Sequence, residues 1–257
     1  MRISRPAVLI IVFASLMQVS CNRKAQLLYL NNLDTELLTS TQPAPYQLRP
    51  GDVLSVQVIT QDPEISRLFN IVSSGTSTSY TAYSNDASLY INGFSVNDSG
   101  MVRLPVVGTM PVAGLTVRQA QDSIQLKYER YLKDALVVVK LLSFKVTVLG
   151  EVRRPGTYTN YRDNLNIFEA IGLAGDFSDY GERTNVLVLR QTPEGVKTFR
   201  LNLQDKNLLT AEGFYLLPND TVIVEPRNAK VMALNTPNIS IFLSIITTAL
   251  LLLNYVK

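Results

Sequence analysis

Short apolar runs, some alternating with polar residues and some continuous, recur between residues 46 and 226, which is typical of β-strands. The clearest run follows a Pro-Gly-Asp turn at 50–52. There Leu54, Val56 and Val58 share one face, while the residues between them share the other, so we predict a strand over 53–59, within the alternating stretch 46–60, with at least one buried side. Further strands are predicted over 101–107, 135–142, 145–149, 157–160, 186–190, 196–201, 215–217 and 221–225.

Two stretches have helical periodicity instead. Thr116 is a candidate N-cap, and Val117, Ala120, Ile124 and Tyr128 follow it at helical spacing. A second helix is predicted over 165–174, with Asn164 as its cap and Gly175 as its end. Small mixed sheets, each covered by one helix, make the predicted fold class α+β.

The amino-terminal end reads as an export signal. Arg2 and Arg5 precede an uncharged apolar stretch that ends at Cys21, with the small residue Ser20 directly before it. We predict that residues 1–20 form a lipoprotein signal peptide and that Cys21 becomes the lipid-modified mature terminus. The alternative is a cysteine in an uncleaved membrane helix, for which the apolar run is short. Residues 21–45 are predicted to be a tether.

The carboxy-terminal end is apolar. After a linker over 227–237, residues 238–256 contain no charged residue and would form a helix about 28 Å long, which predicts a transmembrane helix. Its polar residues fall largely on one face, which favours pore-lining or helix–helix contact; a plain anchor is the alternative. The residues of this face are Ser240, Ser244, Thr247 and Asn254.

Composition removes many kinds of function. The chain has no histidine and one cysteine, so the usual zinc sites and the Ser/His/Asp and Cys/His nucleophile arrangements are excluded. A net charge of +3, without a basic block, argues against nucleic acid as a partner. We therefore predict no catalytic residue, no metal and no cofactor.

Glycine, proline and aspartate mark the predicted turns. We assign these residues structural roles, in which glycines relieve backbone strain, prolines stiffen turns, and aspartates cap neighbouring amides. They are Gly51, Asp52, Gly100, Pro105, Gly108, Gly114, Gly150, Pro155, Gly156 and Asp220.

Residues 46–142 resemble the polysaccharide export domain. The resemblance lies in three ordered phrases: Leu48, Pro50, Gly51, Asp52, Val53 and Leu54; Gly100, Leu104, Pro105 and Gly108; and Val112, Ala113, Gly114, Leu115, Thr116 and Val117.

Residues 143–226 resemble the soluble-ligand-binding β-grasp (SLBB) domain. The matching phrases are Val148, Leu149, Gly150, Glu151, Val152, Arg154, Pro155 and Gly156; Ala170, Ile171, Ala174 and Gly175; and Leu217, Asn219, Asp220, Val222 and Val224.

The resemblance to this Wza-type family implies a function. Such proteins form rings that enclose a periplasmic cavity, so the chain is expected to be a non-catalytic, homo-oligomeric part of a conduit for capsular polysaccharide or exopolysaccharide at the outer membrane. A polysaccharide co-polymerase or tyrosine kinase of the inner membrane is the expected partner. The chain departs from longer members by carrying one β-grasp module, and Asp176 stands where a second glycine is common.

A second function remains open. The chain could be a monomeric, membrane-anchored periplasmic lipoprotein that binds or senses a ligand through its β-grasp domain. The polar face over 240–254 favours the conduit, because an anchor does not require hydroxyls at helical spacing.

Overall fold

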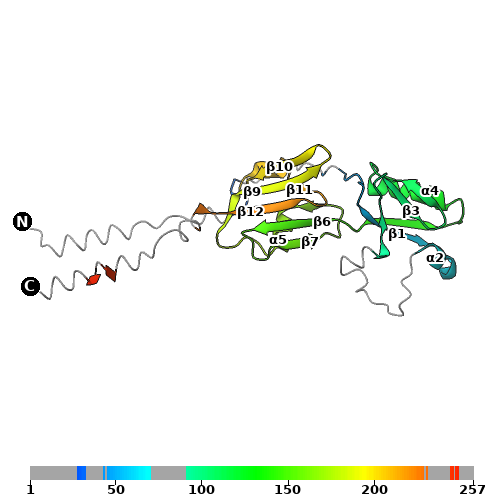
Figure 1. The fold of residues 1–257 in the computed structure, drawn as a ribbon, viewed down its shortest axis with the longest axis horizontal. Helices are drawn as coiled ribbons and strands as arrows, with labels where there is room; N and C mark the ends of the chain where they lie inside the picture. The colour runs from blue at the N-terminus through cyan, green and yellow to red at the C-terminus, as the bar shows by residue number, and fades with distance from the viewer. Residues whose placement is uncertain are drawn as a thin grey trace, which may run out of the picture.

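The computed structural model describes residues 28–32, 43, 45–70, 91–228, 230, 244–245 and 247–248. The described chain forms two folded units that follow one another in the sequence (Figure 1). Of the residues predicted as sites, Cys21, Ser240 and Asn254 lie outside the described part of the chain.

The first unit is built on a three-stranded antiparallel sheet. Strand β1 (Val53–Ile59) lies between β2 (Phe94–Ser95) and β5 (Leu136–Leu141). The sheet is accompanied by a hairpin and two helices: β3 (Met101–Leu104), β4 (Gly108–Pro111), α2 (Pro63–Phe69) and α4 (Val117–Tyr128). The strand predicted over 101–107 ends at Leu104, because Val106 turns the chain with a φ of 64°.

Helix α4 begins where the sequence predicts. The Thr116 side chain accepts a hydrogen bond from the Gln119 amide at 3.2 Å, and the Gln119 side chain accepts one from the Thr116 amide at 2.9 Å, which completes a capping box. The predicted apolar face is buried through Ala120, Ile124 and Tyr128. Its packing against the sheet is specific, because Gln125 Oε1 accepts a hydrogen bond from the Val137 amide at 2.7 Å.

The second unit is built on a five-stranded mixed sheet in the order β10-β9-β12-β6-β7. Strands β12 and β6 are parallel neighbours, while the other pairs are antiparallel. A two-stranded sheet and two short helices complete the unit. The elements are β6 (Lys145–Gly150), β7 (Gly156–Thr159), β8 (Leu165–Asn166), α5 (Ile167–Leu173), β9 (Gly181–Thr192), β10 (Gly195–Leu201), the 3₁₀ helix η3 (Lys206–Thr210), β11 (Tyr215–Leu216) and β12 (Thr221–Pro226).

Helix α5 differs from its prediction at its start. Its N-cap is Asn166 instead of Asn164, because Asn166 accepts a hydrogen bond from the Glu169 amide at 3.0 Å and the Glu169 side chain bonds back to the Asn166 amide. The end is as predicted, with Gly175 in the left-handed region after the helix at φ 78°. Asp176 follows at φ 71°, a conformation that aspartate adopts more readily than most side chains.

Each unit has its own hydrophobic core. In the first, Leu54, Val56 and Val58 pack with the buried side of α4. In the second, residues of β6, β9 and β12 pack against α5. Leu141, at the end of β5, packs against both cores and so lies at the junction.

The predicted fold class needs one correction, at its carboxy-terminal end. Within the described parts of the chain there is no helix with the length and hydropathy needed to cross a membrane. Of residues 238–256, only 244–245 and 247–248 are described; they are helical and exposed, and the hydroxyls of Thr247 and Thr248 donate to the Ser244 carbonyl at 3.0 and 2.7 Å. A span requires about 20 residues of continuous helix. The prediction of a C-terminal transmembrane helix rested on the absence of charge, which does not establish such a helix, and it is wrong.

Candidate binding site at the domain junction

Asp52 forms hydrogen bonds both to residues at the start of the first unit and to Ser143, which lies in the segment that leads into the second unit. Its side chain is 3% exposed. One carboxylate oxygen accepts hydrogen bonds from the Tyr46 hydroxyl at 2.9 Å and the Arg49 amide at 2.8 Å, and the other accepts from the Ser143 hydroxyl at 3.2 Å. Ser143 in turn accepts from the Val53 amide at 3.1 Å. The junction is therefore stabilised by a network of partly buried hydrogen bonds centred on Asp52.

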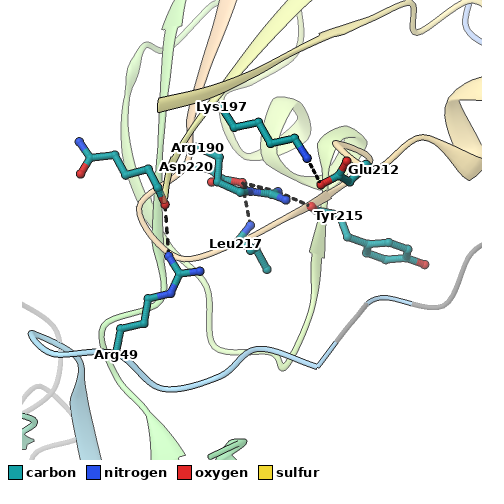
Figure 2. Close-up of polar contacts among 8 residues, drawn as sticks. Arg49, Arg190, Lys197, Glu212, Tyr215, Leu217 and Asp220 are labelled. Atoms are coloured by element: carbon teal, nitrogen blue, oxygen red, sulfur yellow. Dashed lines mark hydrogen bonds and ion pairs between the residues drawn. The ribbon is translucent and has the colours of Figure 1, made fainter. Parts of the chain in front are cut away.

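Asp220 occupies the corresponding turn of the second unit and is paired with a buried arginine. Arg190 Nη2 lies 2.7 Å from Asp220 Oδ2, and Arg190 Nε lies 3.1 Å from Oδ1 (Figure 2). The same carboxylate accepts from the Leu217 amide at 2.8 Å, and Arg190 Nη2 also donates to the Tyr215 carbonyl at 2.8 Å. Burial raises the pKa of Asp220, and its bonds to Arg190 and Leu217 oppose that rise.

A cleft of about 650 Å³ lies beside this pair and reaches the first unit at Pro43 and Tyr46. Its lining is aromatic and charged, which suits a polar ligand that also offers an apolar face. The lining residues that matter for this argument are Tyr46, Phe144, Arg190, Lys197, Glu212 and Tyr215.

Several charged side chains in and beside the cleft already have partners within the protein. Lys197 Nζ lies 2.6 Å from Glu212 Oε1, in an exposed ion pair. Arg49 crosses the junction and donates to the Gln191 carbonyl at 3.2 Å (Figure 2). Burial, and then the neighbouring Asp52 carboxylate, raises the pKa of Tyr46 above its ordinary value, and the protonated phenol donates to that carboxylate.

The arrangement supports binding better than acid–base chemistry. Asp220 and Glu212 are each held by a cation, and Asp52 is surrounded by donors. In the described residues, histidine, cysteine, aspartate and glutamate do not gather in a group of three or more that could hold a metal ion.

The predicted turn residues are spread over both units and do not converge on one site. Gly150 shows most clearly why glycine is required: its φ is 88°, and a Cβ there would lie 2.0 Å from the Val224 carbonyl oxygen. Gly51, Gly100, Gly108 and Gly114 also have positive φ, whereas Gly156 does not.

Two prolines and two hydroxyl residues complete the predicted set. The Pro105 carbonyl accepts a hydrogen bond from the Tyr128 hydroxyl at 3.0 Å, and Pro155 is exposed. Ser244 and Thr247, predicted to line a pore or a helix contact, are exposed in the short described helical segment.

The residues that line the cleft were not predicted as site residues from the sequence. Arg190 carried a usable signal: it continues the inward face of β9 after Val186 and Val188, and a charged residue at an inward strand position requires a buried partner. Lys197 and Glu212 carried none, because their pairing depends on how β10 lies beside the loop before β11.

Comparison with known proteins identifies both units. Residues 40–142 match the family model described as polysaccharide biosynthesis/export protein, and residues 144–224 match that of the SLBB domain. The chain is 26% identical over 200 residues to the EPS I polysaccharide export outer membrane protein EpsA of Ralstonia solanacearum, covering 76% of this chain and 52% of the relative.

Two further relatives are similar over shorter stretches. The protein of the same name from Ralstonia nicotianae is 30% identical over 134 residues, covering 51% of this chain and 34% of the relative. The exopolysaccharide production protein ExoF of Rhizobium meliloti is 32% identical over 104 residues, covering 38% of this chain and 24% of the relative. The matches thus span about half or less of the length of these curated relatives.

Proposed function

This chain belongs to the polysaccharide biosynthesis/export family, and on that premise we propose that it is a component of the apparatus that exports capsular polysaccharide or exopolysaccharide across the outer membrane. The observation that carries the proposal is the ordered pair of family matches, an export domain followed by an SLBB β-grasp domain, in a chain whose relatives are named as export proteins.

In this proposal the chain acts as a ring of identical subunits and catalyses no reaction. Large apolar side chains at strand edges and turns support association: Leu136 of β5 is 57% exposed, Val196 of the edge strand β10 is 62% exposed, and Val106 is 55% exposed. Leu136 and Val196 lie on edge strands, where a neighbouring subunit of the ring would pair the open backbone groups and cover these side chains. The polymer in transit would pass through the ring.

The proposed location is the periplasmic side of the outer membrane, with the lipid on Cys21 as the attachment. The relatives named as outer membrane proteins and the apolar stretch before Cys21 support this location. An inner-membrane polysaccharide co-polymerase or tyrosine kinase would complete the path from synthesis to the surface.

Gene deletion with complementation tests the proposal. In a strain that carries this gene, loss of the chain should reduce surface polysaccharide several-fold while the polymer or its precursors accumulate inside, and the wild-type gene should restore it. Native mass of the detergent-extracted protein should show a defined multimer. Normal surface polysaccharide in the deletion strain would refute the export role, and a monomer would refute the ring.

The junction cleft favours a second candidate function. A monomeric lipoprotein could bind a soluble ligand between Tyr46 and Tyr215, in a space of about 650 Å³ that is within the usual range for small-molecule sites. Calorimetric titration with oligosaccharide fragments of the strain's own polymer separates the two: saturable binding by a monomer supports this candidate, and a multimer without binding supports the conduit.

A further inference from the structure

Residues 28–32 lie on the β-grasp domain, although they belong to the predicted tether. The Leu30 amide donates to the Leu203 carbonyl at 3.1 Å, and the Asn31 amide donates to the Gln204 carbonyl at 2.8 Å. The Asn32 side chain extends the contact, because it accepts from the Lys206 amide at 2.7 Å and donates to Asp205 at 3.2 Å. The segment therefore pairs with the backbone between β10 and η3.

Tyr29 is the side-chain anchor of this segment. Its ring meets Phe168 edge-on at 5.5 Å between centroids and lies 6.1 Å from Phe177. Its hydroxyl donates to Asp176, and burial together with this carboxylate raises the pKa of Tyr29. Helix α5 and the loop that follows it thus supply both the ring contacts and the hydrogen-bond partner of Tyr29.

Arg183 is a buried cation that packs between Tyr29 and Phe177. The residue is 7% exposed, and its guanidinium lies 4.6 Å from the Phe177 centroid and 5.3 Å from the Tyr29 centroid. Its Nε is buried without a hydrogen-bond partner among the described residues. A buried cation with incomplete hydrogen bonding is stabilised by aromatic faces, one of which Tyr29 supplies.

The docking site lies at the end of the domain opposite the junction cleft. Strand β9 runs from one end of the domain to the other, with Arg183 near its start and Arg190 near its end. At the usual rise per residue of a strand, these two residues are about 24 Å apart. Strand β12 ends on the same side as Arg183, away from β1 (Figure 1). Lys230, just after β12, pairs with Glu151, and Glu151 accepts from Ser178 in the loop that carries Asp176.

We infer that residues 28–32 are a docking segment, anchored by Tyr29, that fastens the amino-terminal tether to the far end of the β-grasp domain. Docking leaves seven residue steps between Cys21 and Leu28, which span at most about 25 Å. The consequence for the membrane rests on the lipidation of Cys21 proposed above: this end of the β-grasp domain is held near the bilayer.

Hydrogen exchange on the full-length protein tests the docking itself. In the wild type, the Leu30 and Asn31 amides should exchange slowly because both are hydrogen-bonded. Tyr29→Ala should accelerate their exchange about tenfold or more, and Tyr29→Phe, which keeps the ring contacts and loses the bond to Asp176, should have a smaller effect. Tyr161→Ala is the matched control, since Tyr161 is 75% exposed.

Exchange of amides in the core of the domain serves as the folding control for this test. The Val186 and Val188 amides should stay protected in every variant, which shows that the domain is still folded. Fast exchange at Leu30 and Asn31 in the wild type, or equal rates in the wild type and Tyr29→Ala, would overturn the docking inference.

Fluorescence quenching tests the distance to the membrane. Acylated Cys21 would leave a cysteine introduced by Asp179→Cys or by Arg103→Cys as the only free thiol, and both positions are exposed. In vesicles with a headgroup quencher, a fluorophore at 179 should be quenched more than one at 103, and Tyr29→Ala should reduce the difference.

Mass spectrometry of Cys21 separates the two hypotheses. Acylation with equal quenching at both labels would overturn the inference about distance. Absence of acylation would instead remove the lipid proposal, while docking would still be decided by exchange.

Discussion

Two aspartates, one in each domain, occupy nearly the same local structure. Asp52 follows Pro50 and Gly51, Asp220 follows Pro218 and Asn219, and the residue before each aspartate has a positive φ, 90° and 66° respectively. Each carboxylate accepts a hydrogen bond from the amide three residues earlier, at 2.8 Å in both cases. Both side chains are almost completely buried.

They differ in what else they bind. Asp52 accepts from the neutral hydroxyls of Tyr46 and Ser143, and Ser143 lies 91 residues later in the chain, so this aspartate connects the export domain to the junction. Asp220 holds the guanidinium of Arg190 inside a single domain. The same turn therefore has two roles. In the export domain its aspartate bonds to the segment that leads to the next domain, and in the β-grasp domain its aspartate neutralises the buried Arg190.

The largest expected effect is at Asp220. Asp220→Ala leaves Arg190 buried without its counter-charge, which should cost about 3–5 kcal/mol of the free energy of unfolding of the β-grasp domain. Exchange protection of the amides of β9 and β12 under increasing denaturant measures this cost.

Glu212→Ala is the control for this prediction. It breaks the exposed ion pair with Lys197 and should cost about 1 kcal/mol or less. If the two substitutions cost the same, the burial of the Arg190–Asp220 pair would not matter energetically.

The second effect is at Asp52 and should be smaller, because the partners left behind are neutral. Asp52→Ala should cost about 1–3 kcal/mol of export-domain stability through the unpaired Tyr46 hydroxyl and Arg49 amide. It should also lower the pKa of Tyr46, which stays above its ordinary value because burial is the larger cause of the shift. Ultraviolet titration measures that pKa, and an unchanged value would contradict the contribution of Asp52.

This comparison also shows how far sequence reasoning reached. The strand β1, the start of α4 and the turns before Asp52 and Asp220 were predictable, because periodicity and capping act within a few residues. The pairing of Arg190 with Asp220 spans 30 residues and depends on the register of β9 and β12.

Longer-range features could not be predicted from local pattern. The contact of Tyr29 with Asp176 joins residues 147 apart, and the segment that carries Tyr29 has no periodicity of its own. Strand β9 begins at Gly181, five residues before its prediction, because the ladder with β12 continues past an irregularity to Gly181, through residues without an apolar pattern. The error at 238–256 arose because an uncharged stretch of sufficient length does not by itself establish a spanning helix.

The third prediction concerns the hydrogen bond of Tyr128, in which both partners are neutral. Tyr128 is fully buried and donates to the Pro105 carbonyl at 3.0 Å, and burial raises its pKa to about 12. Tyr128→Phe keeps the packing against Phe69 and should cost about 0.5–1.5 kcal/mol. Chemical denaturation measures the loss. A cost equal to that of Asp220→Ala would remove the distinction between charged and neutral buried partners.

The smallest effect concerns the partly exposed carboxylate of Glu151, whose pKa shifts in the direction opposite to that of Asp220. Hydrogen bonds from Lys230 and Ser178 lower the pKa of Glu151, whereas burial raises that of Asp220. A lowered folded-state pKa means that Glu151 contributes stability above its unfolded pKa of about 4.5 and loses it as the pH falls through the folded value. The side chains are 16% and 37% exposed, so the pair should contribute about 1 kcal/mol or less.

Glu151→Gln should therefore destabilise the protein at pH 7, and its effect should diminish as the pH falls through the lowered folded-state pKa of Glu151, because the wild-type carboxylate is then protonated too. Thermal unfolding of Glu151→Gln, Lys230→Gln and the double variant at pH 7 and at about pH 3 measures the coupling between the two side chains. A coupling that persists unchanged in acid would show that Lys230 is held by packing and that charge plays no part. Because Lys230 follows β12 at the end of the domain where Tyr29 docks, the same cycle measures how much this ion pair stabilises that end of the domain.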